Sequence, residues 1–271
     1  MIELLAPALV ACFLLACILG YFGLHVLMRE VIFVDLALAQ LAALGATVGH
    51  LQSAHGSGIV TYLWSFGFTL GGAAIFALAR PARTRLPQEA VIGIVYGVSA
   101  ALVILVLSKS ALDRDEVESM LTGRLLFAGW DEIGAMALLF IAVAALHFRL
   151  RGAFLKLSEQ ARHPEPRSSR DKLLDFIFYA SFGVVVTSSV PLTGVLVVFG
   201  MLIVPAACAA IFFDGLGRRL LAGWAVGALA SAAGVAASAW WDLPTGASVV
   251  AALGAAFALA LLFALFQSAE G

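Results

Sequence analysis

Charged side chains are scarce in this chain of 271 residues: Lys, Arg, Asp and Glu make up 12% of it, about half of the ~25% that is usual in soluble domains. Hydrophobic residues account for 62%, and the mean hydropathy is +1.03. This composition excludes a soluble domain of useful size and indicates an integral membrane protein. Since one membrane span needs ~20 apolar residues, the chain has room for about eight to ten spans.

Several catalytic signatures are absent. A Walker A loop needs glycine before its lysine, but the only lysines, Lys109, Lys156 and Lys172, follow Ser, Leu and Asp. HExxH does not occur, and the five histidines show no ligand spacing on a single helix. The three cysteines lie in apolar runs without CxxC spacing, which is typical of small buried hydrophobic residues. The chain is therefore not expected to be an enzyme, and movement of a solute across the membrane is the favoured class.

Apolar runs separated by short polar stretches predict an all-α polytopic membrane protein with eight or nine transmembrane helices. The uncertainty in number comes from TSSVPLTG, residues 187–194, which reads either as a turn between two spans or as a short re-entrant break. The nine runs fall near residues 4–28, 31–51, 59–79, 88–107, 133–150, 173–189, 193–213, 219–240 and 247–266.

The positive charges predict the orientation. With the N-terminus outside and the spans alternating, the outer face receives only Lys109, Arg114 and Arg124 of the 16 basic residues, and nine spans leave the C-terminus inside. Such an excess of Lys and Arg on one face marks the cytoplasmic side of a membrane protein. The inner face receives Arg29, Arg80, Arg83, Arg85, Arg149, Arg151, Lys156, Arg162, Arg167, Arg170, Lys172, Arg218 and Arg219.

Two polar segments interrupt an otherwise single transmembrane domain, residues 1–271. The outer segment, residues 108–132, is partly amphipathic, and we expect it to lie at the membrane surface. The inner segment, residues 151–172, is the longest polar stretch and carries most of the inner charge. Because long loops in pared-down membrane proteins are usually functional or disordered, we interpret it as a docking surface for a cytoplasmic partner.

The second span, VIFVDLALAQLAALGATVG, contains a carboxylate, Asp35, and an amide, Gln40. Ionisable groups within spans usually face a bundle interior or a water-filled path, because lipid penalises them. A carboxylate so near a helix start also has an ordinary explanation, since it can cap the helix or pair with Arg29. Position alone leaves both interpretations open.

Residues 173–213, LLDFIFYASFGVVVTSSVPLTGVLVVFGMLIVPAACAAIFF, resemble the later core of the permease subunits of bacterial metal-ion ABC importers, the ABC-3 type that serves zinc, manganese and iron. The likeness rests on the Gly-Val-Leu-Val-Val stretch at 194–198 and on Leu-Ile-Val-Pro-Ala at 202–206. Three further blocks agree with the family in order and spacing: residues 86–109, 121–133 and 242–250.

This resemblance implies a permease bundle like that of type II ABC importers, in the bacterial inner membrane. It also implies that the permease pairs with a second copy, as a homodimer or with a paralogue, and rests on a separate ATPase subunit that binds ATP. A periplasmic or lipoprotein binding protein would deliver a divalent metal, most often zinc or manganese. No cofactor of its own and no nucleic-acid partner is expected.

Site residues follow from the same resemblance. In many family members the second span carries an Asp and a His four residues apart in the metal path, whereas this chain has Asp35 and, five residues later, Gln40. His50 and Glu89 are weaker candidates along the path, and capping or a salt bridge with Arg85 is an equally good role for Glu89. The coupling residues that would meet the ATPase are Ser158, Glu159, Ala161 and Arg162.

Two other classes stay open at this level. A secondary transporter driven by an ion gradient would carry ionisable groups at mid-membrane and two matching halves with interrupted helices, and no clear half-to-half copy is visible. A membrane subunit that transports nothing is the third class, and Gln40 in place of a histidine keeps it open. Dependence on a separate ATPase distinguishes the importer from both.

Overall fold

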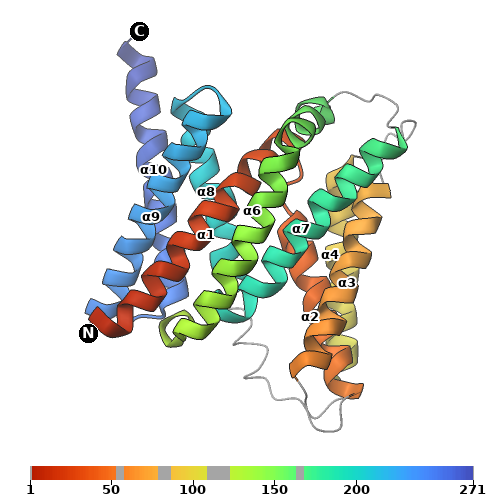
Figure 1. Ribbon diagram of the computed structural model, residues 1–271. Coiled ribbons are helices and arrows are strands. Elements are labelled where there is room, and N and C mark those ends of the chain that lie inside the picture. Colours follow the sequence, from red (N-terminus) through yellow and green to blue (C-terminus); the bar gives the residue numbers. More distant parts are fainter. Residues whose placement is uncertain (1, 53–57, 79–86, 109–122, 163–167, 271) are drawn as a thin grey trace. The chain divides into compact units, whose positions relative to one another are not determined.

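The computed structural model describes the chain apart from residues 1, 53–57, 79–86, 109–122, 163–167 and 271 (Figure 1). Nine of the helices in this described part are long and apolar enough to cross a membrane, so the all-α polytopic prediction is confirmed. The elements are α1 (Ile2–Arg29), α2 (Val34–Gln52), α3 (Gly58–Leu78), α4 (Gln88–Leu107), η1 (Leu125–Phe127), α6 (Trp130–Glu159), η2 (Gln160–Arg162), α7 (Ser169–Thr193), α8 (Val195–Phe212), α9 (Leu216–Trp241) and α10 (Thr245–Glu270).

The stretch at residues 187–194 contains no re-entrant loop. Helix α7 continues through Pro191 to Thr193, and α8 begins only two residues later, at Val195. Gly194, between the two helices, has φ +82°, a conformation that glycine adopts without steric cost. The nine-span alternative therefore describes the helices better than the eight-span one.

The inner polar segment, residues 151–172, begins as a continuation of the preceding span. Helix α6 runs nine residues beyond the predicted end at residue 150, and η2 continues it to Arg162. The inner segment is therefore largely an extension of a span. Of the outer segment, residues 109–122 lie outside the described part, and its remainder includes the short helix η1.

The described residues group into two compact units that are interleaved in sequence. Unit 1 comprises Met1–Leu27, Glu118–Ala144 and Ser189–Gly271; unit 2 comprises Met28–Val117 and Ala145–Ser188. Helices α1, α6 and α7 each contribute to both units. The prediction of a single domain stays a prediction.

In unit 1, α8, α9 and α10 pack against one another, as their adjacent blue ribbons in Figure 1 show. Small residues allow close approach: a Cβ on Gly234 of α9 would lie 2.5 Å from the Cα of Val249 in α10. The indole N–H of Trp224 donates a 2.9 Å hydrogen bond to the carbonyl of Cys17, which joins α9 to α1. Backbone contact of this kind is the usual way in which helices associate in lipid.

In unit 2, α2 packs against both α3 and α4 (Figure 1). A Cβ on Gly45 of α2 would lie 2.5 Å from the carbonyl oxygen of Trp64 in α3, and the hydroxyl of Ser65 donates to the carbonyl of Ala42 at 2.8 Å. Helix α2 is thus held between two neighbours, and its first turn lies next to the first turn of α4.

Replacing Gly23 by Ala is expected to disrupt unit 1. A Cβ at Gly23 would lie 1.9 Å from the carbonyl oxygen of Leu202, and a backbone clash cannot be relieved by a rotamer change. Thermal unfolding in detergent should show a marked fall in Tm or a failure to express. Gly254→Ala is the matched control, because nothing lies within 4 Å of its Cβ position and alanine is the better helix former. Equal melting temperatures for the two variants would contradict this packing.

Candidate functional site

Asp35 lies in the first turn of α2 and is 1% exposed. Among the described residues, neither of its carboxylate oxygens has a hydrogen-bond partner. Its place in the first turn is at the positive end of the helix dipole. The ion pair that the structure gives for Arg29 is with Asp175, so the alternative in which Arg29 neutralises Asp35 is not what is observed.

Glu89 lies in the first turn of α4, which packs against α2. Its Oε1 accepts a 3.0 Å hydrogen bond from the backbone N–H of Phe33, just before α2 begins. Its Oε2 is buried and has no partner in the described part of the chain. Glu89 is close enough for its charge to act on Asp35. The fold thus brings together two of the four predicted path residues, which we call the carboxylate pair. The proposed salt bridge of Glu89 with Arg85 falls outside the described residues.

The carboxylate pair has the chemistry of a cation site. Two carboxylates that share a buried place repel each other strongly, because the local dielectric is low, and a buried charge is costly unless it is paired. A bound cation removes both penalties. Carboxylate oxygens are hard ligands that suit manganese, magnesium and calcium, whereas imidazole and thiolate are preferred by zinc. Within the described residues, no group of three or more His, Cys, Asp or Glu side chains is placed to hold a metal.

The other two predicted path residues lie apart from the pair. Gln40 is half-buried, five residues along α2 from Asp35, which is ~140° around the helix. His50 is exposed in the last turn of α2, ~22 Å along the helix axis from Asp35. The structure therefore does not gather all four residues at one point, and their roles in a path stay predictions.

The predicted coupling residues differ in how far their side chains are buried. Ser158, in the last turn of α6, is fully buried, whereas Glu159 is exposed and Ala161 is half-buried in η2. The side chain of Arg162 is outside the described part. Of the predicted coupling residues whose side chains are described, Glu159 is the exposed one, and Ser158 faces the interior of unit 2.

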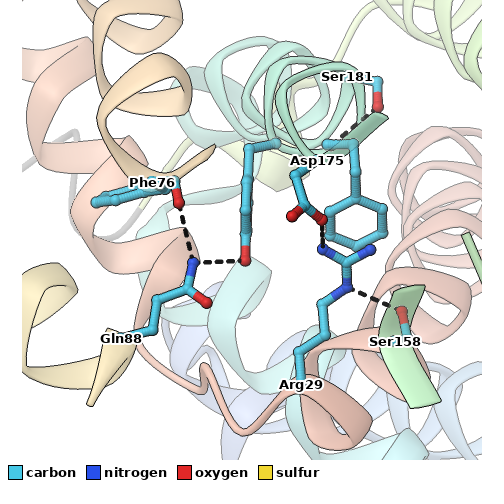
Figure 2. A network of polar contacts seen from close by, with 8 residues as sticks. Arg29, Phe76, Gln88, Ser158, Asp175 and Ser181 are labelled. Carbon is cyan, nitrogen blue, oxygen red and sulfur yellow. Dashed lines mark hydrogen bonds and ion pairs between the residues drawn. The ribbon is translucent and has the colours of Figure 1, made fainter. Parts of the chain in front are cut away.

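Ser158 belongs to a buried polar network centred on Arg29, the last residue of α1 (Figure 2). The Nε of Arg29 donates to Ser158 Oγ at 2.8 Å, and its Nη1 donates to Asp175 Oδ1 of α7 at 2.8 Å. The guanidinium carbon lies 3.9 Å from the centre of the Phe178 ring, a cation–π contact. We call Arg29, Ser158 and Asp175 the arginine cluster.

A second branch of the network, also shown in Figure 2, connects α4 to α7. The amide nitrogen of Gln88 donates to the hydroxyl of Tyr179 at 2.9 Å and to the carbonyl of Phe76 at 3.1 Å. Tyr179 is next to Phe178, whose ring lies against Arg29. Since Gln88 immediately precedes Glu89, this branch fixes the start of α4 beside the carboxylate pair.

Sequence reasoning missed Asp175 and the inward role of Ser158. Asp175 carried a usable signal, because it is an ionisable residue within an apolar run, as Asp35 is. Ser158 carried none, since a serine near a helix end is ordinary. Arg29 was recognised as one of the inner positive charges and as a possible partner of Asp35, but not as the partner of Asp175.

Nine helices in the described part of the chain are long and apolar enough to span a membrane, and two of them carry the carboxylate pair, so the protein is a polytopic membrane protein with acidic side chains in its spans. The model of the ABC 3 transport family matches residues 1–264. The chain therefore belongs to this family, and the prediction of an ABC-3-type permease is confirmed.

Curated relatives and a solved structure agree with this assignment. The chain is 24% identical over 263 residues to the uncharacterised membrane protein slr2045 of Synechocystis sp. (strain ATCC 27184 / PCC 6803 / Kazusa), covering 96% of this chain and 91% of that one. It is 26% identical over 212 residues to the manganese transport system membrane protein MntC of Listeria monocytogenes, covering 76% and 75%. It shares its fold with PsaBC from Streptococcus pneumoniae, with a TM-score of 0.74, 19% identity and coverage of 95% and 90%.

Proposed function

We propose that this chain is the permease subunit of an ABC importer that moves a divalent metal ion inward across the bacterial inner membrane. A separate ATPase subunit supplies the energy, and a periplasmic or lipoprotein binding protein delivers the metal. The observation that carries the proposal is the carboxylate pair. Asp35 is buried in a span with both oxygens unpartnered among the described residues, and a carboxylate in such a place is stabilised either by taking up a proton or by binding a cation.

The ligand chemistry favours manganese over zinc as cargo. The described residues that meet at the pair offer carboxylate oxygens, and Gln40, which lies apart from the pair, is an amide where many family members have histidine. Oxygen donors suit manganese, whereas zinc prefers imidazole and thiolate. The Listeria relative is named as part of a manganese transport system, which supports the same choice.

The energy-coupling partner is proposed to meet the permease at residues 158–162. With the N-terminus outside, the starts of α2, α4 and α7 and the ends of α1 and α6 all lie on the inner side. The contacts of Arg29 with Ser158 and Asp175 agree with this arrangement, because they join helix ends that the alternating topology assigns to one side. A second permease copy is expected to complete the central path.

Uptake into proteoliposomes tests the proposal. The chain is reconstituted with its ATPase and binding protein, and labelled manganese and zinc are supplied on the binding-protein side, with and without ATP on the ATPase side. We expect ATP-dependent uptake of manganese that exceeds uptake of zinc. Uptake that ignores ATP and follows a proton or sodium gradient would instead indicate a secondary transporter. An absence of uptake under both conditions would indicate a subunit that transports nothing.

A further inference from the structure

The residue that links the inner segment to the carboxylate pair is Arg29. On one side it holds Ser158, which is in the last turn of α6 and directly precedes the exposed Glu159. The Oγ of Ser158 is 2.8 Å from Arg29 Nε, although the two residues are 129 positions apart in the chain. Since Ser158 has no exposed surface, displacement of the end of α6 reaches Arg29 directly.

On its other side Arg29 leads into the short connection between α1 and α2, residues 30–33, which we call the corner. Glu30 follows it with φ +56°, a left-handed conformation that few residues other than glycine adopt. At the far end of the corner, the backbone N–H of Phe33 is bonded to Glu89. Asp35 comes two residues later. At one end of the corner, Arg29 is bonded to α6 and α7. At the other end, Phe33 is bonded to α4.

We propose that Arg29 is a positioning residue that transmits movement of the ATPase-facing segment to the carboxylate pair. The inference rests on the proposed function, since it assumes that residues 158–162 meet the ATPase. A shift of Ser158 pulls Arg29, rotates the corner about Glu30, and changes the separation of Asp35 and Glu89. The cation site is thus tightened or opened from the cytoplasmic side.

The chemistry of arginine fits this role. Its rigid, planar guanidinium holds Ser158 and Asp175 at the same time, through Nε and Nη1, both at 2.8 Å. The face of the same group rests on Phe178. A flexible point charge such as lysine lacks this fixed fork. Asp175 and Phe178 anchor Arg29 on α7, and Ser158 is the member of the cluster that comes from α6.

The first experiment replaces Ser158 by Ala in the full complex with the ATPase and binding protein. ATP hydrolysis and uptake of labelled manganese are measured on the same proteoliposomes. We expect hydrolysis to continue while manganese taken up per ATP falls about tenfold, a typical size for loss of coupling between two sites. Ser181→Ala is the matched control, because that buried hydroxyl bonds to His147 and to the carbonyl of Phe178, and among the described residues it makes no bond to Arg29 itself. In the Ser181→Ala complex, the manganese taken up per ATP should equal that of the unsubstituted complex.

A second variant separates coupling from folding. Arg29→Met combined with Asp175→Leu removes both charges, and such apolar replacements of buried ion pairs often fold well. We expect it to assemble with the ATPase and hydrolyse ATP, with uptake per ATP reduced at least as much as in Ser158→Ala. Arg218→Met is its control, since Arg218 is exposed on α9 and lies outside the inner segment, residues 151–172.

The outcomes separate this inference from the proposed function. If the unsubstituted complex shows no ATP-dependent uptake, the proposed function fails, and this inference fails with it. If the unsubstituted complex transports manganese and both cluster variants keep its uptake per ATP, the inference alone is overturned. A fall in the Ser181→Ala ratio equal to that of Ser158→Ala would also overturn it, because the effect would then follow from loss of any buried serine bond.

Discussion

Replacing Asp35 by Asn should abolish most metal uptake while leaving the protein as stable as before, or more stable. Asparagine keeps the size of the side chain and its ability to cap a helix. It removes a charge that is buried with no hydrogen-bond partner among the described residues, so folding loses nothing. The site loses a charged ligand. Because changes merely adjacent to metal ligands typically cost ~10–100-fold in affinity or activity, we expect uptake to fall by at least that factor.

This substitution decides between the two interpretations of Asp35. If the carboxylate only caps α2, Asn is tolerated and uptake is unchanged, which would contradict a role in the metal path. The control is Asp131→Asn, an exposed carboxylate in the first turn of α6, which should transport normally. Glu89→Gln is also expected to reduce uptake, because the second negative charge of the pair is lost. Its amide oxygen can still accept the hydrogen bond from the backbone N–H of Phe33. Uptake and Tm are measured on the same preparations.

Replacing Arg29 alone by Met is expected to be among the most destabilising single changes in unit 2. It would remove the ion pair with Asp175, which is 1% exposed, and the hydrogen bond to Ser158. Removing one partner of a buried ion pair typically costs ~3–5 kcal/mol. For a chain of this length that corresponds to a Tm lower by roughly 10 °C. The measurement is thermal unfolding of the purified protein in detergent.

The double change provides the internal check. Because Arg29→Met with Asp175→Leu leaves no uncompensated charge, its Tm should recover most of the loss seen in Arg29→Met. The sum of the two single effects should therefore exceed the effect of the double change. Additive effects would mean that the 2.8 Å contact between the two side chains contributes little to stability, and would contradict the prediction.

Much of the molecule was predictable from local sequence. The spans followed from apolar length, because a backbone in lipid must satisfy its own hydrogen bonds and a helix does so within one segment. The positions of Asp35 and Glu89 near helix starts also followed, since Asp35 is the fifth residue of the predicted span at 31–51 and Glu89 is the second residue of that at 88–107. The sequence contains four glycine pairs spaced four apart, at 45/49, 67/71, 93/97 and 223/227, a pattern that is typical of close helix packing. Gly45 and Gly227 do pack tightly, whereas Gly67 and Gly93 have nothing within 4 Å, a difference that the spacing does not contain.

The sequence by itself determined that this is a polytopic helical membrane protein of the ABC-3 type, because hydropathy and short motifs act within one span at a time. Only the tertiary structure decided which polar groups meet. Arg29 pairs with Asp175, 146 positions away, and Phe33 binds Glu89, 56 positions away. Such pairings depend on how whole helices pack, and packing is set by side chains distributed over several spans. The candidate cation site and the arginine cluster are therefore properties of the fold, although each of their residues is visible in the sequence.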